Sequence, residues 1–140
     1  MNATNGASTF EQALSNYQNG APLPQVIASF KEITQQTPRQ AAGWTCLAWL
    51  QLLNAEVEDA LHSAKTAVKI NPQDPQARIN LSLAMLENGA KGVREHIELV
   101  KRVMAFSPEL SRELEASIAD GLQRKPGWPA LEKVKAWLAA

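Results

Sequence analysis

The side chains that could carry out chemistry are few and far apart. The sequence of 140 residues holds two histidines, His62 in EDALHSAK and His96 in REHIEL. Neither belongs to a pattern such as HExxH, in which two histidines one helical turn apart bind a metal ion. The stretch ENGAKGV lacks the spacing of a phosphate-binding loop and follows no predicted strand. We therefore expect no enzyme: no catalytic residues, no metal site and no cofactor.

Composition and charge exclude further classes. Lys plus Arg and Asp plus Glu number 14 each, whereas a nucleic-acid or acidic-membrane partner needs a clustered positive face. Cys46 is the single cysteine, lies in an apolar run and is expected to be a small buried side chain. No apolar stretch approaches the roughly 18 residues of a membrane span, and the first residues lack the features of a signal peptide. We expect a soluble, cytoplasmic protein that does not insert into membranes.

The elements that must position any site are predicted to be helices. Apolar residues recur every three or four positions, as in the stripe Leu47, Leu50 and Leu53, and no run alternates as a strand would. Gly, Pro and Asn residues interrupt this pattern at regular intervals. The pattern predicts eight helices near residues 8–19, 23–36, 40–53, 56–70, 75–88, 91–106, 109–124 and 129–139.

The last predicted helix has the character of a cap. Pro129 suits its first turn, where a missing N–H costs no hydrogen bond. Leu131, Val134, Trp137 and Leu138 give it an apolar face. We expect this face to cover the end of the preceding helices.

Three prolines recur at a spacing typical of a repeat. Pro38 and Pro72 are 34 residues apart, and Pro108 follows 36 residues later. Two predicted helices lie between successive prolines, and a period near 34 with two helices per unit indicates a helical solenoid. The stretch INPQDPQA is then the seam between two units, where Asp74 caps the next helix and Pro75 takes its first position.

Residues between the prolines resemble the tetratricopeptide repeat (TPR). The middle unit carries the pattern of that family at Trp44, Leu47, Ala48, Ala60, Ala64, Ala67 and Pro72. Gln51 and Arg78 stand where the family has aromatic residues, and Ala64 stands at a matching position where the family has a large residue. In the first unit, Ala13 and Leu14 replace the Leu–Gly/Ala pair, and Val26 and Ile33 replace small residues. The third unit also needs two extra residues within ENGAKGVREH to stay in phase.

The resemblance implies an all-α fold, a right-handed TPR-like helical solenoid of antiparallel helix pairs with a C-terminal capping helix. It implies one domain over residues 1–140, with repeats at about 7–40, 41–74 and 75–110 and C-terminal helices at about 111–140. Small residues let paired helices approach, and each unit must stack on its neighbours to bury its apolar face.

The resemblance also implies a binding surface, because the first helices of TPR units line a concave groove. The positions that match its lining are, in the two later units, Thr45, Trp49, Leu52, Ile79, Asn80, Leu83 and Leu86. This set is largely apolar, and Trp49 is the expected anchor since aromatic residues dominate binding hot spots. The alternative is that Trp49 and Leu83 pack against adjacent helices, or that the C-terminal helix closes over them.

One branch of the family binds a free C-terminal carboxylate with Lys, Arg and Asn side chains. The matching positions here hold Glu11, Ser15, Cys46, Gln76 and Asn80, none of them basic. We therefore do not expect recognition of that kind.

Three functions follow in order of preference. The first is a non-enzymatic scaffold or assembly factor that binds an apolar or amphipathic segment of a protein or peptide partner in the groove. The second is a self-associating structural module, a homo-oligomer. The third is a small ligand-binding or enzymatic helical bundle, which needs a polar pocket that the sequence does not reveal.

Overall fold

Helices make up nearly all of residues 6–140, the part of the chain that the computed structural model describes. They are α1 (Gly6–Gln18), α2 (Leu23–Gln36), α3 (Ala41–Leu53), α4 (Val57–Ile70), α5 (Pro75–Glu87), α6 (Arg94–Phe106), α7 (Pro108–Arg124) and α8 (Pro129–Ala139). Each corresponds to one of the predicted helices. The largest difference is at α6, which begins at Arg94 rather than near residue 91 because Gly89 and Gly92 hold the preceding loop at φ of 71° and 98°.

Side chains cap the first turns of α5 and α7, and the cap of α5 is the one predicted from the stretch INPQDPQA. The Asp74 side chain accepts a hydrogen bond from the Gln76 N–H at 3.2 Å, and Pro75 is the first residue of α5. Ser107 caps α7 in the same way through the Leu110 N–H at 3.2 Å, ahead of Pro108. The interpretation of INPQDPQA as a helix end followed by a capped helix start is thus confirmed.

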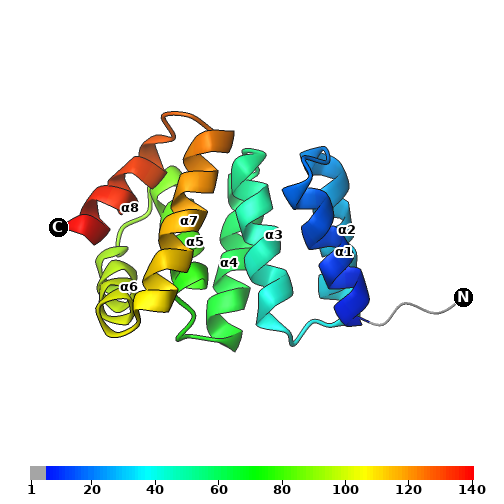
Figure 1. Cartoon of the computed structure of the whole chain (residues 1–140), viewed down its shortest axis with the longest axis horizontal. Coiled ribbons are helices and arrows are strands. Elements are labelled where there is room, and N and C mark those ends of the chain that lie inside the picture. Colours follow the sequence, from blue (N-terminus) through cyan, green and yellow to red (C-terminus); the bar gives the residue numbers. More distant parts are fainter. Residues whose placement is uncertain (1–5) are drawn as a thin grey trace, which may run out of the picture.

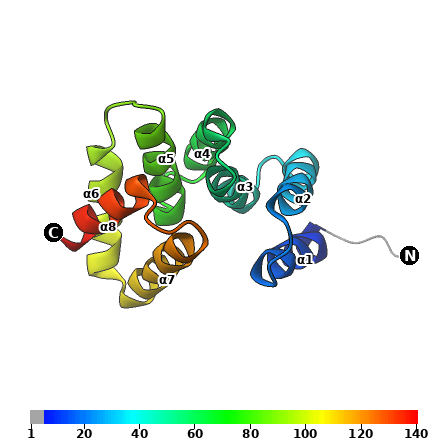
Figure 2. The same cartoon turned by 90° about the horizontal axis from the view of Figure 1, so that it is seen from above.

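The helices form a curved row of antiparallel pairs (Figure 1). Each of the first six packs on the next one in the chain, and α3 also contacts α5. Seen from above, α1 and α7 lie on the same side of α3, below it in Figure 2, whereas α4 lies on the opposite side. The predicted all-α, TPR-like solenoid is confirmed.

Contacts in the turns recur with a period of 34 residues. The Trp44 indole N–H donates to the carbonyl of Pro38 at 2.9 Å, and the Arg78 Nε–H donates to the carbonyl of Pro72 at 2.9 Å. Both donors lie six residues after the proline. Arg78, which departs from the aromatic residue of the TPR pattern, therefore makes the same turn-closing bond as Trp44.

The two histidines repeat this relation. His62 packs edge-on against the Trp44 ring with centroids 6.0 Å apart, and His96 Nδ1 lies 2.8 Å from a terminal guanidinium nitrogen of Arg78. Each histidine thus contacts the residue 18 positions before it, at the contact between the two helices of a pair. Both histidines thus make contacts that hold paired helices together.

The second departure, Gln51, is also explained by a contact. Its side chain is 3% exposed and accepts a hydrogen bond from Ser63, itself buried, at 2.7 Å. A polar pair between α3 and α4 replaces the aromatic contact, and burial is tolerated because the donor and acceptor meet.

In the described part of the chain, the buried apolar residues form two large cores and a small third cluster at Ala48, Ala64 and Leu81, and α3 contributes to all three. The N-terminal core joins α1, α2 and α3 through Ala13, Val26, Ile27, Phe30, Ile33, Leu47 and Leu50. The C-terminal core joins α3 to α8 and includes Trp49, Leu52, Ile79, Leu83, Ile97, Val100, Leu114, Ile118, Trp128, Leu131 and Val134. Adjacent residues of α3, Trp49 and Leu50, thus contribute to different cores.

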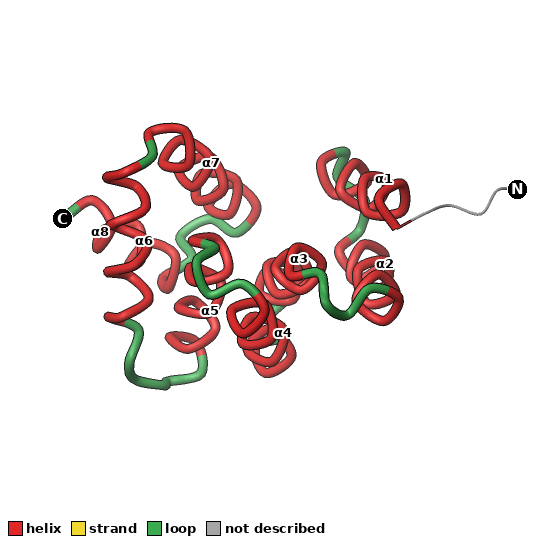
Figure 3. Tube along the Cα trace, turned by 90° about the horizontal axis from the view of Figure 1, so that it is seen from below, coloured by secondary structure: helices red, strands yellow, loops and turns green. Residues whose placement is uncertain are grey.

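Helix α8 covers the C-terminal end, as its apolar face predicted. It contacts α5, α6 and α7 and crosses them obliquely (Figure 3). Leu131 and Val134 are fully buried, whereas Trp137 remains 39% exposed near the end of the helix. Among the described residues, no helix has the length and apolar character needed to cross a membrane.

Candidate functional site

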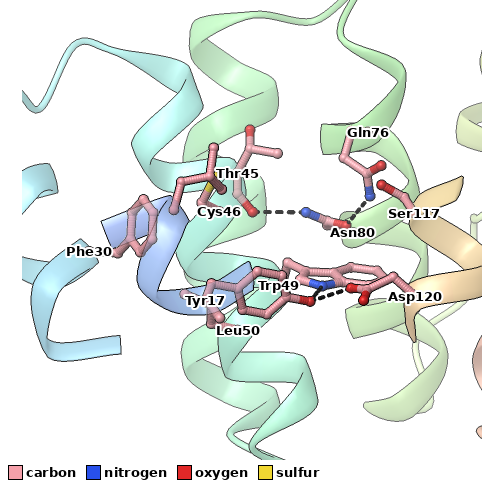
Figure 4. Close-up of a pocket in the computed structure, with 11 residues that line it drawn as sticks. Tyr17, Phe30, Thr45, Cys46, Trp49, Leu50, Gln76, Asn80, Ser117 and Asp120 are labelled. Carbon is pink, nitrogen blue, oxygen red and sulfur yellow. Dashed lines mark hydrogen bonds between the residues drawn. The ribbon is translucent and has the colours of Figure 1, made fainter. Parts of the chain in front are cut away.

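A hollow of about 170 Å³ lies between α1, α2, α3, α5 and α7 (Figure 4). Its wall is formed by Leu14, Tyr17, Phe30, Thr45, Cys46, Trp49, Leu50, Gln76, Asn80, Ser117 and Asp120. Five helices contribute to it, and we call it the inner hollow. A hollow of this size has room for one or two side chains.

One side of the inner hollow is apolar. Phe30 and Leu50 belong to the N-terminal core, and Leu14 of α1 lies beside them. Cys46 adds a thiol that burial, and to a lesser degree Asp74, keeps neutral by raising its pKa to about 12. An apolar side chain entering here would leave water for a surface of carbon and sulfur.

The opposite side is polar and already satisfied by internal hydrogen bonds. The Asn80 side chain is fully buried, donates to the Thr45 carbonyl at 2.9 Å and accepts from the Gln76 side chain at 2.9 Å (Figure 4). The first of these bonds joins α5 to the backbone of α3. Asn80 therefore fixes the two helices against each other and forms a rigid edge of the hollow.

Tyr17 spans the hollow from α1 to α7. Its hydroxyl donates to the Asp120 carboxylate at 2.5 Å and accepts the Trp49 indole N–H at 2.9 Å (Figure 4). Burial, and then the bond to Asp120, raises the pKa of Tyr17 well above its usual value of 10.0. The hydroxyl thus stays protonated and acts as a hydrogen-bond donor at any physiological pH.

Arg124 completes this contact from the outer side. Its Nε lies 3.0 and 3.2 Å from the two Asp120 oxygens, and a terminal nitrogen donates to the Tyr17 carbonyl at 3.0 Å. The guanidinium carbon also lies 3.7 Å from the centre of the Tyr17 ring, a cation–π arrangement. We call Tyr17, Asp120 and Arg124 the clasp.

The structure separates the residues predicted to line the groove. Thr45, Trp49 and Asn80 line the inner hollow. Leu52, Ile79 and Leu83 are fully buried in the C-terminal core, so they offer no surface to a partner while α8 is in place. Leu86 is half-buried and borders a different hollow beside Trp128. A binding role stays a prediction for the whole set.

Trp49 is less open than an anchor for a partner would be. Its side chain is 9% exposed, its ring lies 5.7 Å from that of Trp128, and it packs directly against the backbone at Gly121. A Cβ at Gly121 would lie 2.7 Å from the Trp49 ring. Trp49 is therefore mainly a core residue, and its indole N–H edge is the part that reaches the hollow.

Sequence reasoning did not find the clasp. Tyr17 and Asp120 are 103 positions apart, and Asp120 lies in a helix outside the three predicted repeats. No local pattern signals a contact of that range. Only the curvature of the row, which brings α1 and α7 to the same side, makes it.

The inner hollow has features that suit the binding of a side chain. No group of three or more His, Cys, Asp or Glu side chains that could hold a metal ion occurs within residues 6–140. Instead, the inner hollow has an apolar side, a fixed polar edge and a few side chains at its rim. Such a site can accept an apolar side chain and orient the backbone that carries it.

The comparisons with known proteins support the fold. No protein-family model matches this sequence, and no curated protein matches it. A crystal structure of the Yersinia enterocolitica type III secretion translocator chaperone SycD, described as an alternative dimer, is similar with a TM-score of 0.70. The sequences are 15% identical over 96% of this chain and 95% of that one.

A second structure shows SycD in complex with a peptide of the translocator YopD. It is similar with a TM-score of 0.67 and 16% identity over 91% of this chain and 90% of that one. The chain therefore has the fold of this TPR-like chaperone over nearly its whole length.

Proposed function

We propose that the protein is a non-enzymatic scaffold of the chaperone type that binds an apolar or amphipathic segment of a partner protein in the concave side of the solenoid. The observation that supports this most is the inner hollow, where an apolar surface and a fixed polar edge meet between α1, α3, α5 and α7. A structure of similar fold, SycD, holds a peptide of the translocator YopD.

The contact surface differs from the one that the TPR positions alone predict. An apolar side chain of the partner packs beside Leu14 and Cys46, which are partly exposed, and next to the indole edge of Trp49. Phe30 and Leu50 lie beneath it and shape the floor of the hollow. Ser117, at the rim, is partly exposed and lies near enough to contact the segment's backbone. Leu52, Ile79 and Leu83 act indirectly, by fixing the helices that shape the hollow.

A selection from a random peptide library displayed on phage tests this function. The tightest selected peptide is labelled, and its affinity is measured by fluorescence anisotropy. Ser117→Leu fills the hollow, so we expect at least a tenfold loss of affinity. The matched control is Ser111→Leu, which adds the same side chain to α7 at a position that does not line the inner hollow. Equal affinity of both variants and the original protein contradicts the assignment to the inner hollow.

A second candidate function, self-association, is favoured by exposed apolar side chains near the C-terminal end. Phe106 is 91% exposed, Trp137 39% and Leu110 36%. Sedimentation velocity over a wide concentration range tests it, with Phe106→Ser as the variant. A single monomer boundary at every concentration excludes this candidate. The cytoplasmic location expected from the sequence stays a prediction.

A further inference from the structure

The clasp is the contact that joins α1 to α7 across the mouth of the inner hollow. It consists of the Tyr17 hydroxyl on Asp120, and of Arg124 on the carbonyl and ring of Tyr17. Asp120 and Arg124 have side chains that are 37% and 27% exposed, so water can replace their bonds when they separate. The side chains of Asp120 and Arg124 can therefore leave Tyr17 while Tyr17 stays packed against both cores.

A second hollow lies on the outer side of the clasp. It has a volume of about 410 Å³ and is lined by Tyr17, Gln18, Glu113, Ala116, Ser117, Asp120 and Arg124. Three of these residues, Tyr17, Ser117 and Asp120, also line the inner hollow. The clasp is therefore the partition between two hollows that meet at the same residues.

We propose that the clasp is a gate that competes with the partner segment for the groove. When Tyr17 and Asp120 separate, the two hollows join into one open groove between α1 and α7. An extended peptide segment then takes the place of Asp120, and one of its carbonyl oxygens accepts the hydrogen bond of the Tyr17 hydroxyl. Arg124, released from Asp120, becomes a second donor. This regulation rests on the proposed binding function.

The chemistry of the clasp agrees with such an exchange. The Tyr17 hydroxyl is held in place by the Trp49 N–H, which it accepts at 2.9 Å, so it keeps its position when Asp120 leaves. An extended peptide segment presents neutral carbonyl oxygens, which do not need a cationic partner. No Lys, Arg or His is among the residues that line the inner hollow. The carboxylate of Asp120 is thus an internal substitute for a ligand oxygen.

Asp120→Ala tests the gate with the labelled peptide selected above. Removing the competing carboxylate should raise peptide affinity at least fivefold and increase the association rate. Tyr17→Phe also opens the clasp, so the peptide should associate faster. Because this variant lacks the hydroxyl that would bind the peptide carbonyl, the peptide should also dissociate faster. The matched control, Glu115→Ala, removes an exposed carboxylate from α7 outside the clasp and should change neither rate. Unchanged or weaker binding by Asp120→Ala overturns the gate.

A distance measurement reports on the clasp without any peptide. Nitroxide labels at Gln18→Cys and Glu113→Cys, two exposed positions on α1 and α7, are placed in a Cys46→Ala background. Electron–electron resonance should give a wider distance distribution with Asp120→Ala than with Glu115→Ala. Identical distributions overturn the gate.

The failure of the gate and the failure of the proposed function give different results. If the original protein selects no peptide, the selection is repeated with Asp120→Ala. Binders selected by that variant alone support the gate, whereas no binders from either protein overturn both proposals. Peptides that bind all clasp variants equally support the binding function and overturn the gate.

Discussion

At the scale of single residues, Gly121 decides how closely α7 approaches the rest of the protein. An added Cβ would lie 2.7 Å from Leu131 Cδ2 and from the Trp49 ring, closer than carbon atoms can pack. Leu131 is fully buried and the indole is rigid, so neither can move away without disturbing the core. The glycine thus lets Trp49 occupy the space between α3, α7 and α8.

Gly121→Val should therefore destabilise the protein. We expect the free energy of unfolding to fall by about 2–3 kcal/mol, because overpacking a filled core forces side chains and backbone to shift. Urea denaturation followed by circular dichroism measures it. Ala119→Val, at an exposed position of the same helix, is the control and should cost only about 0.5 kcal/mol through helix propensity. Similar losses in the two variants would contradict the packing argument.

His96 should make stability depend on pH. Burial, and then the neighbouring Arg78 guanidinium, lowers the pKa of His96 below 6.5, against an opposing effect of Glu95. The unfolded chain then binds the proton more readily than the folded one, so stability is complete above about pH 6.5 and falls as pH decreases through the lower folded pKa. Thermal unfolding between pH 7.5 and 5 measures the change.

The matched variants for that experiment are His96→Gln and His62→Gln. Glutamine at position 96 keeps an acceptor for Arg78 but cannot titrate, so the loss of stability below pH 6.5 should become smaller. The loss should persist in His62→Gln. A pH dependence that is the same in His96→Gln as in the original protein would show that another group is responsible.

At the scale of the elements, the starts of α5 and α7 are fixed by local interactions that the sequence displays. Asp74 and Ser107 cap α5 and α7 with a side-chain oxygen, and the following prolines fill the first helical position. The cap of α5 also costs stability, because burial disfavours the charged form of the Asp74 carboxyl. Burial raises the pKa of Asp74 above 3.8, although the N–H groups of Gln76 and Ala77 oppose this shift. The carboxylate is thus partly desolvated at neutral pH.

Substitutions at Asp74 should separate its two roles. Asp74→Ala removes the cap and is expected to lower the free energy of unfolding by about 1 kcal/mol. Asp74→Asn keeps an oxygen acceptor without the desolvated charge, so its stability at pH 7 should equal or exceed that of the original protein. For a carboxyl with a raised folded pKa, stability decreases as pH rises from about 3.8, and this change should disappear in Asp74→Asn. Urea denaturation at pH 3.5 and pH 7 tests both statements.

These local devices explain why the elements could be predicted from the sequence. Periodic apolar residues and breakers such as Asn71 to Pro75 act over a few positions, so eight helices and their order follow from the sequence alone. The start of α6 could not be placed, because ENGAKGV contains two glycines and the left-handed conformation of both is visible only in the structure.

At the scale of the whole molecule, α8 converts the end of the row into part of its core. Trp128, Leu131 and Val134 are almost or fully buried against α3 and α5, and they cover Leu52, Ile79 and Leu83. The last helix is therefore required by the fold, as a capping element is in any array whose units cannot bury their apolar faces alone.

Leu131→Ala should show this dependence. We expect a loss of about 2–5 kcal/mol in the free energy of unfolding, because the site is closed on all sides and the cavity cannot collapse. Lys135→Ala, at an exposed position of α8, should change stability by less than about 0.5 kcal/mol. Thermal and urea unfolding of both variants measures the difference. An effect of Leu131→Ala below about 1 kcal/mol would mean that α8 packs loosely.

The candidate site could be predicted only in part. Thr45, Trp49 and Asn80 were found because the TPR resemblance identifies one face of α3 and α5. That resemblance says nothing of how α7 and α8 fold back, so it could not show that Leu83 is covered or that Asp120 reaches Tyr17. Contacts within a repeat are set by local spacing, whereas those that close the site depend on the accumulated curvature of the row.

The clasp has a consequence for the order of folding. Most helix contacts join neighbours in the chain, and such contacts form early because little chain entropy is lost in making them. The Tyr17–Asp120 bond joins residues 103 positions apart and requires the intervening helix pairs to be in place, so we expect it to form last. A linear array frays independently at its two ends. Here the clasp couples α1 to α7, so that the unfolding of either helix also removes a contact of the other.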